Sequence, residues 1–343
     1  MLFKIFSNLL VNFNFNCMKN SKNKLFKQAF SLIEVSIVIV IIGILIVGII
    51  KGKDLYIAAK VSTAKNLTTN SHIVRIKSLS AWYESSANDF GLGDKLKDEA
   101  SIETWSDISP FGKGLSRGST AISCQKDGSN SNGCIYREDG LANIPAISFS
   151  NDANFTGDTN FSASNDYTML LVFSLKNMAN NQRIIKIGDI SINYIAASQS
   201  DTSKLLIASA TTVDLTTTVS SAELPDFTSK CQSVTDSFLC AVVISKKYTS
   251  ATDAATNFSK IYVNNTKDYL LSDTEVLPTF TGESKLFIAG PKNISIEGSI
   301  PAVSSFSGNI AEIALFNDSF TQKEIDKLMK EYIAKKYSVS IKE

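Results

Sequence analysis

A single acidic residue, Glu34, lies at the start of a long apolar segment. From Val35 to Ile50 every residue is apolar or glycine except Ser36. A carboxylate at the centre of a bilayer costs at least about 2.5 kcal/mol, and less near the bilayer edge. The chemistry that we expect of Glu34 is therefore pairing with a cation. The alternative is a carboxylate at the membrane interface without a partner.

Four cysteines form two close pairs, Cys124 with Cys134 and Cys231 with Cys240, and Cys17 lies apart from them. Zinc ribbons use Cys-x-x-Cys spacing, which neither pair has. Each interval can instead close a small loop. We therefore predict two local disulfides, which place this part of the chain in an oxidising compartment. Each would stabilise the fold by about 2–3 kcal/mol. Buried free thiols are the alternative.

The residues that common catalytic sites need are scarce. His72 is the only histidine, which excludes a multi-histidine metal site and fits a polar linker residue. A serine hydrolase would have only His72 to serve as its base. We predict that the protein is not an enzyme and carries no cofactor. Without residues 1–29, which hold five lysines and no acid, 29 basic residues face 33 acidic ones. This balance argues against a nucleic-acid partner.

The segment before the apolar run divides into two parts of different character. Residues 18–29 are short and basic and end in a small residue, Ala29. Residues 1–17 are rich in Phe, Leu and Asn and have a single lysine. We predict a leader over residues 1–29 and expect the true translation start to be Met18, so that residues 18–29 form the leader of the translated chain.

The apolar run itself, residues 30–50, is long enough to cross a membrane. As a helix it would extend about 31 Å, close to the thickness of the hydrocarbon core. A conventional secretory signal, the main alternative, is cut after its apolar region at an A-x-A-like site. Residues 51–54, Lys-Gly-Lys-Asp, offer no such site. We therefore expect the run to be retained, with its N-terminus in the cytoplasm because lysines are denser there.

Helical spacing continues beyond the membrane segment. Apolar residues recur up to Ala64, whereas residues 66–71 favour a helix poorly. We predict a helix over residues 30–66, a linker over residues 67–72 and a single large domain over residues 73–343.

In the predicted domain over residues 73–343, short β-like runs alternate with stretches of Asn, Asp, Ser and Gly. A T-x-x-E capping box at Thr321 and Glu324 then predicts an amphipathic C-terminal helix to about Tyr337. The expected fold is α+β: a long N-terminal hydrophobic helix, a mainly-β sandwich of jelly-roll type and a short C-terminal helix. The clearest predicted strands are Tyr167–Leu175, Gln182–Ile187, Ser203–Ser209, Phe238–Ser245, Lys260–Val263, Lys267–Leu271, Leu286–Ala289 and Asn309–Phe316.

Together, the basic leader, Ala29-Phe30-Ser31-Leu32-Ile33-Glu34-Val35 and the apolar run resemble the N-terminus of type IV pilins and pseudopilins. The resemblance covers roughly residues 18–65. It implies cleavage by prepilin peptidase between Ala29 and Phe30, and N-methylation of Phe30. It also implies that Glu34 pairs with the N-terminal amine of a neighbouring subunit during assembly. Ala29 and Ser31 stand where the family more often has Gly and Thr.

Residues 73–340 resemble the concanavalin A-like (laminin-G-like) superfamily, on three motifs in order. These motifs are Trp82 with Trp105-Ser106-Asp107-Ile108-Ser109, then Pro145-Ala146-Ile147-Ser148-Phe149, and last Gly308-Asn309-Ile310-Ala311-Glu312-Ile313. The resemblance implies a jelly roll.

Some members of this superfamily are β-glucanases, whose E-x-D-x-x-E carboxylates share one strand face. That triplet is absent here, and Glu312 stands alone on a predicted face with Ile310, Ala314 and Phe316. We interpret Glu312 as a structural acid. The two tryptophans could stack on sugars, but core positions are the simpler interpretation. Calcium could be held by loop acids, although solvated acids explain them as well. The acids considered are Asp152, Asp158, Asp166, Asp189 and Asp201.

Two functions from different classes follow. In the first, the chain is a type IV pilin-like or pseudopilin-like subunit, processed by prepilin peptidase and assembled with other such subunits. The helix then leaves the inner membrane, and the head is displayed in the periplasm or at the cell surface for adhesion or recognition. In the second, the chain is a membrane-anchored module that binds a glycan or a surface protein and does not polymerise. A glycosidase is a third, weaker alternative.

Overall fold

The structure is a computed structural model of the whole chain. It describes residues 32–88, 90–93, 96–110, 115–117, 133–150, 153–162, 166–197, 202–213, 216–234, 237–247, 258–264, 269–270, 277, 285–289 and 303–340. The chain divides into two compact units, Met1–Gly52 and Lys53–Glu343, and the boundary falls within a helix.

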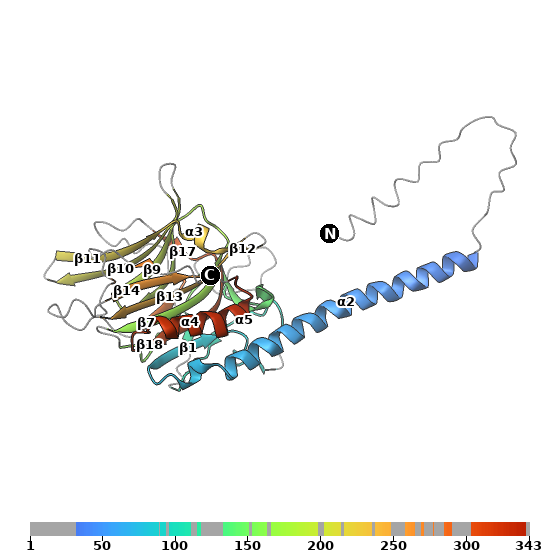
Figure 1. The fold of residues 1–343 in the computed structure, drawn as a ribbon. Helices are drawn as coiled ribbons and strands as arrows, with labels where there is room; N and C mark the ends of the chain where they lie inside the picture. The colour runs from blue at the N-terminus through green and yellow to red at the C-terminus, as the bar shows by residue number, and fades with distance from the viewer. Residues whose placement is uncertain are drawn as a thin grey trace, which may run out of the picture. The chain divides into compact units, whose positions relative to one another are not determined.

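That helix, α2, runs without a break over Leu32–Thr69 (Figure 1). It extends beyond the end predicted at residue 66, so the first residues of the predicted linker are helical. Tertiary contacts override the weak local propensity because Ala64 and Thr68 are buried in the second unit. The hydroxyl of Thr68 also donates to the carbonyl oxygen of Ala64 at 3.0 Å. A short 3₁₀ helix, η1 (His72–Arg75), follows at once.

Among the described residues, the second unit contains two sheets of nine strands each. The predicted β-sandwich is therefore confirmed. The first sheet consists of β1 (Leu79–Glu84), β4 (Ile135–Leu141), β5 (Ile144–Phe149), β7 (Tyr167–Leu175), β12 (Gln232–Val234), β13 (Ser237–Lys247), β14 (Phe258–Val263), β15 (Tyr269–Leu270) and β18 (Gly308–Phe316). The second consists of β2 (Thr104–Trp105), β3 (Leu115–Arg117), β6 (Phe155–Asp158), β8 (Gln182–Ile187), β9 (Ile190–Ile195), β10 (Lys204–Val213), β11 (Thr216–Pro225), β16 (Lys285–Ile288) and β17 (Ser304–Ser305).

Neighbouring strands are antiparallel, except that β17 pairs in parallel with β8. The first sheet has the order β15-β14-β13-β7-β18-β5-β4, with β1 also paired to β18. The second has the order β11-β10-β9-β8-β16-β6-β3-β2. Strand β7 lies at the centre of the first sheet, between β13 and β18.

Alternating side chains of the first sheet enter two different cores. On β7, Met169, Leu171 and Phe173 belong to the core shared with the second sheet. Leu170 and Val172 face the other way, into a core that they share with the C-terminal helices. Both faces of the strand are therefore apolar, which explains its unbroken hydrophobic run.

Strand β18 corrects one detail of the sequence analysis. A β-bulge interrupts its pairing with β7 between Ile310 and Glu312, which leaves Ala311 as the extra residue. Ile310 enters the core between the sheets, whereas Ala311 enters the core under the helices. The prediction that Ile310 shares a face with Glu312 is therefore wrong. The physical reason is that an inserted residue reverses the alternation.

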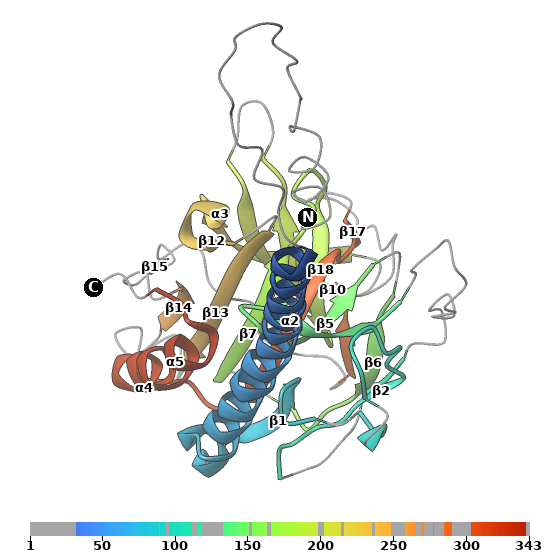
Figure 2. The same ribbon diagram turned by 90° about the vertical axis from the view of Figure 1, so that its right-hand side faces the viewer.

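The C-terminal helical segment covers the outer face of the first sheet (Figures 1 and 2). It consists of α4 (Gln322–Lys327), a π-helical turn η4 (Leu328–Ile333) and α5 (Ala334–Tyr337). The predicted capping box is present, because Thr321 accepts from the backbone of Glu324 and the Glu324 side chain accepts from Thr321. The predicted end at Tyr337 is also confirmed.

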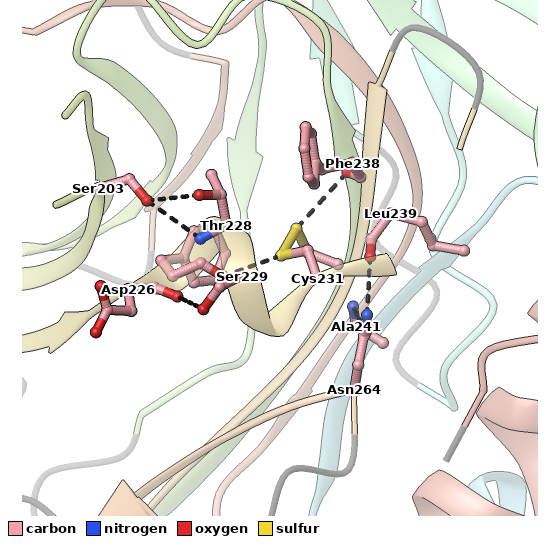
Figure 3. Close-up of a disulfide and its surroundings, with 11 residues drawn as sticks. Ser203, Asp226, Thr228, Ser229, Cys231, Phe238, Leu239, Ala241 and Asn264 are labelled. Atoms are coloured by element: carbon pink, nitrogen blue, oxygen red, sulfur yellow. Dashed lines mark hydrogen bonds between the residues drawn. A yellow bond between two sulfur atoms is a disulfide. The ribbon is translucent and has the colours of Figure 1, made fainter. Parts of the chain in front are cut away.

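A disulfide joins Cys231, which follows the short helix α3 (Phe227–Lys230), to Cys240 on β13 (Figure 3). Nearby, the side chain of Asn264 forms two hydrogen bonds with β13. Its Oδ1 accepts from the backbone NH of Ala241 at 2.8 Å, and its Nδ2 donates to the carbonyl oxygen of Leu239 at 2.9 Å. Cys134 is buried, while Cys124 lies outside the described residues, so their pairing stays a prediction.

Gly308, at the start of β18, gives a direct test of this packing. A Cβ there would collide with the carbonyl oxygen of Ser174 and lie 2.7 Å from the Phe306 ring. We expect Gly308→Ala to lower the free energy of unfolding by about 1–3 kcal/mol. Urea titration of the full-length protein in detergent measures this. The control is Gly52→Ala, where no atom lies within 4 Å; equal midpoints for both variants would contradict the packing described.

Candidate functional site

The first candidate site is the N-terminal part of α2. Glu34 lies in its first turn. Ala29 and Phe30, the residues of the predicted cleavage, lie outside the described residues, so processing stays a prediction.

The side chains of α2 form an exposed apolar surface. Within the described residues, one helix is long and apolar enough to cross a membrane, and none of its apolar window is buried. Leu32 is 88% exposed and Ile44 is 67% exposed. Signal sequences pass the same test, so this part of α2 is a candidate for a membrane anchor or for a signal sequence.

The second candidate site is a buried cluster of charges in the Lys53–Glu343 unit. Glu84 on β1 and Glu312 on β18 stand directly opposite each other across the antiparallel pair. Both are completely buried. Like charges in such positions destabilise a sheet, and buried carboxylates are costly to desolvate. A compensating cation is therefore required.

Lys336, on α5, supplies that cation. Its Nζ lies 2.8 Å from Glu84 Oε1 and 2.9 Å from Glu312 Oε2, with both side chains inaccessible to solvent. The same Nζ donates to Thr68 Oγ1, at 2.8 Å. Lys336 thus joins the end of α2, two strands of the first sheet and the last helix. Among these described groups, two carboxylates face one ammonium, which leaves a net negative charge.

The carboxylate of Glu312 also accepts hydrogen bonds from uncharged donors. Glu312 accepts hydrogen bonds from Trp82 Nε1 at 2.8 Å, from the Tyr332 hydroxyl at 2.8 Å and from the Tyr337 hydroxyl at 2.7 Å. Such charge-assisted bonds are about twice as strong as neutral ones. Glu312 is therefore hydrogen-bonded inside the sandwich, as the sequence analysis expected of this acid.

Glu84 is held by the turn that follows its own strand. The backbone NH and the hydroxyl of Ser86 both donate to Oε1, at 2.7 and 2.6 Å. The backbone NH of Ala87 donates to Oε2 at 2.7 Å. This arrangement fixes the position of the carboxyl group beside Lys336.

The phenols of this cluster remain protonated over a wide pH range. Burial raises the pKa of Tyr332 and of Tyr337 well above the usual value, and the negative charges of Glu312 and Glu84 raise both further. Each phenol therefore acts as a hydrogen-bond donor to Glu312 at neutral pH.

A groove of about 460 Å³ lies beside this cluster, between the end of α2 and the C-terminal helices. Thr63, His72, Glu331 and Lys335 are among its lining residues. Burial lowers the pKa of His72, and nearby Lys327 lowers it further, while Glu331 raises it. His72 is thus part of the junction at η1 rather than of an extended linker.

The tryptophan motif proves to be structural. Trp82 and Trp105 are 1% and 0% exposed, so neither ring is open to stack on a sugar. Asp107 Oδ1 accepts from the backbone NH of Trp82 at 2.8 Å and from that of Ser109 at 2.7 Å. The hydrogen bonds of Asp107 therefore fix the loop that carries this motif against β1.

No group of three or more His, Cys, Asp or Glu residues in the described ranges could hold a metal ion. Asp158, Asp166 and Asp189 are described and lie in no such group, whereas Asp152 and Asp201 fall outside the described residues. Calcium binding stays untested.

Sequence reasoning missed Lys336 and Glu84. The signal was present, because Lys336 follows Ile325, Leu328 and Tyr332 on the buried stripe of the C-terminal helix. A lysine at the next position of an apolar stripe indicates a buried cation that needs an anionic partner.

Replacing Lys336 tests the cluster. Lys336→Met leaves two opposed carboxylates without their cation, so we expect a loss of about 3–5 kcal/mol in the free energy of unfolding. The matched control is Lys335→Met at the neighbouring exposed position, which should change stability by less than about 0.5 kcal/mol. Urea unfolding of the full-length protein measures both, and similar midpoints would refute the role of Lys336.

The tyrosine pKa values predict a loss of stability at alkaline pH. A phenol whose pKa is raised on folding favours the folded state below its unfolded pKa of about 10 and loses that contribution as the pH rises further. We expect the fall in stability from about pH 9 to about pH 11 to be shallower in Tyr337→Phe than in the wild type. The control is Tyr56→Phe. Tyr56 is 52% exposed, so this substitution should leave the slope unchanged. Parallel slopes in all three proteins would contradict the account.

Comparison with known proteins places the chain in no family. No protein-family model matches it, and no curated protein matches it. Solved structures resemble it at low identity. The binding domain of botulinum neurotoxin serotype C1 is 13% identical, with a TM-score of 0.46, over 76% of this chain and 53% of that one. A Trypanosoma rangeli sialidase in complex with sialic acid is 10% identical, with a TM-score of 0.40. The match covers 75% of this chain and 33% of the sialidase chain.

A third similar structure is the CBM40 of the Ruminococcus gnavus IT-sialidase. It is 10% identical, with a TM-score of 0.34, over 54% of this chain and 96% of that one. The chain thus spans about half the length of the neurotoxin chain and a third of the Trypanosoma sialidase. The strand pairing described above, rather than these similarities, defines the β-sandwich.

Proposed function

We propose that this protein is a membrane-anchored binding module, in which α2 holds the chain in a bilayer and the β-sandwich carries the recognition surface. The observation that carries this proposal is the uniformly exposed apolar surface of α2 from Leu32 to Ile50. As a helix this segment is about 29 Å long, which matches the hydrocarbon core of a bilayer.

The orientation that we propose places the sandwich outside the cytoplasm. Five lysines and no acid in residues 1–29 favour a cytoplasmic N-terminus. The disulfide between Cys231 and Cys240 is compatible with an oxidising compartment such as the periplasm.

A glycan is the first ligand class to test, because the three motifs of the β domain resemble the concanavalin A-like superfamily. The full-length protein in nanodiscs can be screened on a glycan array and against surface-protein extracts. We expect retention of a defined glycan class. Reducing-sugar release from the same glycans would instead support a glycosidase, and binding of a protein alone would replace the glycan as ligand.

Type IV pilin-like assembly is the second candidate function. The specific observation in its favour is the segment Ala29–Val35, with Glu34 in the first turn of α2. On this account prepilin peptidase cuts between Ala29 and Phe30 and methylates Phe30. Glu34 then pairs with the new amine of a neighbouring subunit, because opposite charges neutralise each other in a low dielectric.

Substitution of Glu34 separates the two functions. We expect Glu34→Ala to abolish cross-linkable subunit contacts and surface filaments while membrane insertion and cleavage continue. The matched control is Ser36→Ala in the same turn, which should assemble normally. Unchanged assembly of Glu34→Ala would reject the pilin-like role of this residue. Absence of assembly in the wild type would favour the binding module that does not polymerise.

A further inference from the structure

The buried cluster has the geometry of a reacting pair as well as that of an ion pair. Nζ of Lys336 lies 2.8 Å from Glu84 Oε1, and both side chains are inaccessible to solvent. An amine this close to a carboxyl oxygen is also within reach of the carbon that bears it. Reacting groups held in such proximity gain effective concentrations on the order of 10⁵–10⁸ M.

We propose that Lys336 and Glu84 condense to form an intramolecular amide, which joins β1 covalently to α5. The proposal rests on the folded Lys53–Glu343 unit and does not depend on the function proposed above.

Burial favours condensation over a persistent ion pair. A buried ammonium and a buried carboxylate each carry a desolvation cost even when they are paired, and an amide carries no charge. The amide removes one ammonium and one carboxylate and leaves Glu312 with the donors Trp82, Tyr332 and Tyr337. Exclusion of water also withholds the reactant needed for the reverse hydrolysis.

Glu84 is the carboxyl group prepared for attack. The backbone NH groups of Ser86 and Ala87 donate to its two oxygens, each at 2.7 Å. Backbone donors in this arrangement stabilise the negative oxygen of a tetrahedral intermediate. Glu312 instead accepts from side chains, and the pairing of β1 with β18 places it directly opposite Glu84.

Glu312 is the group that carries the protons. Its Oε2 lies 2.9 Å from Nζ of Lys336, within the distance required of a general base. It accepts protons from the lysine nitrogen and delivers them to the departing oxygen of Glu84. The carboxylate of Glu312 is regenerated at the end of the reaction.

The step balances without a further reactant. Nζ forms a bond to Cδ of Glu84, and one carbon–oxygen bond of that carboxyl group breaks. The oxygen leaves as water with two protons that come from the lysine ammonium. The third proton remains on the amide nitrogen, and nothing is oxidised or reduced.

Peptide mapping of the full-length protein tests the proposal. Trypsin does not cut after an acylated lysine. The amide therefore predicts a branched species in which peptide 78–95, with Glu84, is joined to peptide 336–342, less the mass of one water. Tandem mass spectrometry should locate the bond at Glu84 and Lys336. Recovery of peptide 78–95 in its unlinked form alone would overturn the proposal, and a link to peptide 293–323, with Glu312, would overturn the assignment of roles.

Three variants separate the roles within the cluster. Lys336→Arg keeps the cation but cannot form the amide, so the branched peptide should disappear. Glu312→Gln keeps the shape of the side chain but cannot carry protons, and should abolish the link while Glu84 is intact. The matched control, Lys335→Arg, should retain it. A branched peptide of wild-type yield in Glu312→Gln would exclude Glu312 as the proton carrier, and the wild-type map decides the proposal even if a variant fails to fold.

Discussion

The second unit depends on the neutralisation of two carboxylates that face each other on neighbouring strands. Glu84 and Glu312 are opposed in the pairing of β1 with β18, and Lys336 lies within hydrogen-bond distance of both. Without the lysine, sheet pairing would force two negative charges together away from water. This requirement constrains where the C-terminal helix lies, because α5 must point Lys336 toward both carboxylates. It also constrains the turn after β1, whose backbone bonds Glu84.

The same lysine brings together parts of the chain that are far apart in sequence. Its bond to Thr68 reaches the end of α2, which explains why that helix continues past a stretch of low helical propensity. At this end of α2, Ala64 is buried in the core under the C-terminal helices and Leu67 packs against that core, so apolar contacts accompany the hydrogen bond of Thr68. For a protein anchored through α2, this junction is where a load on the helix would enter the sandwich.

Much of the fold could be predicted from local patterns. Tyr167–Leu175 and Gln182–Ile187 are strands with the predicted bounds, and the capping box at Thr321 starts α4. These features depend on residues close in sequence. The bulge at Ala311 could not be predicted, because it arises from pairing with β7 and not from the residues of β18 themselves. The charge cluster was missed for the same reason, since its members come from residues 68, 84, 312 and 336.

The central claim is that the end of α2, the β1–β18 pair and the C-terminal helix form one cooperative unit through Lys336. Native-state hydrogen exchange of the full-length protein tests this claim most directly, because it reports the opening free energy of each segment. The account predicts that amides of residues 64–69, of β1 and of the segment from α4 to α5 exchange together, with one shared opening free energy. Exchange of the C-terminal helix well before β1, with residues 64–69 unaffected, would contradict it.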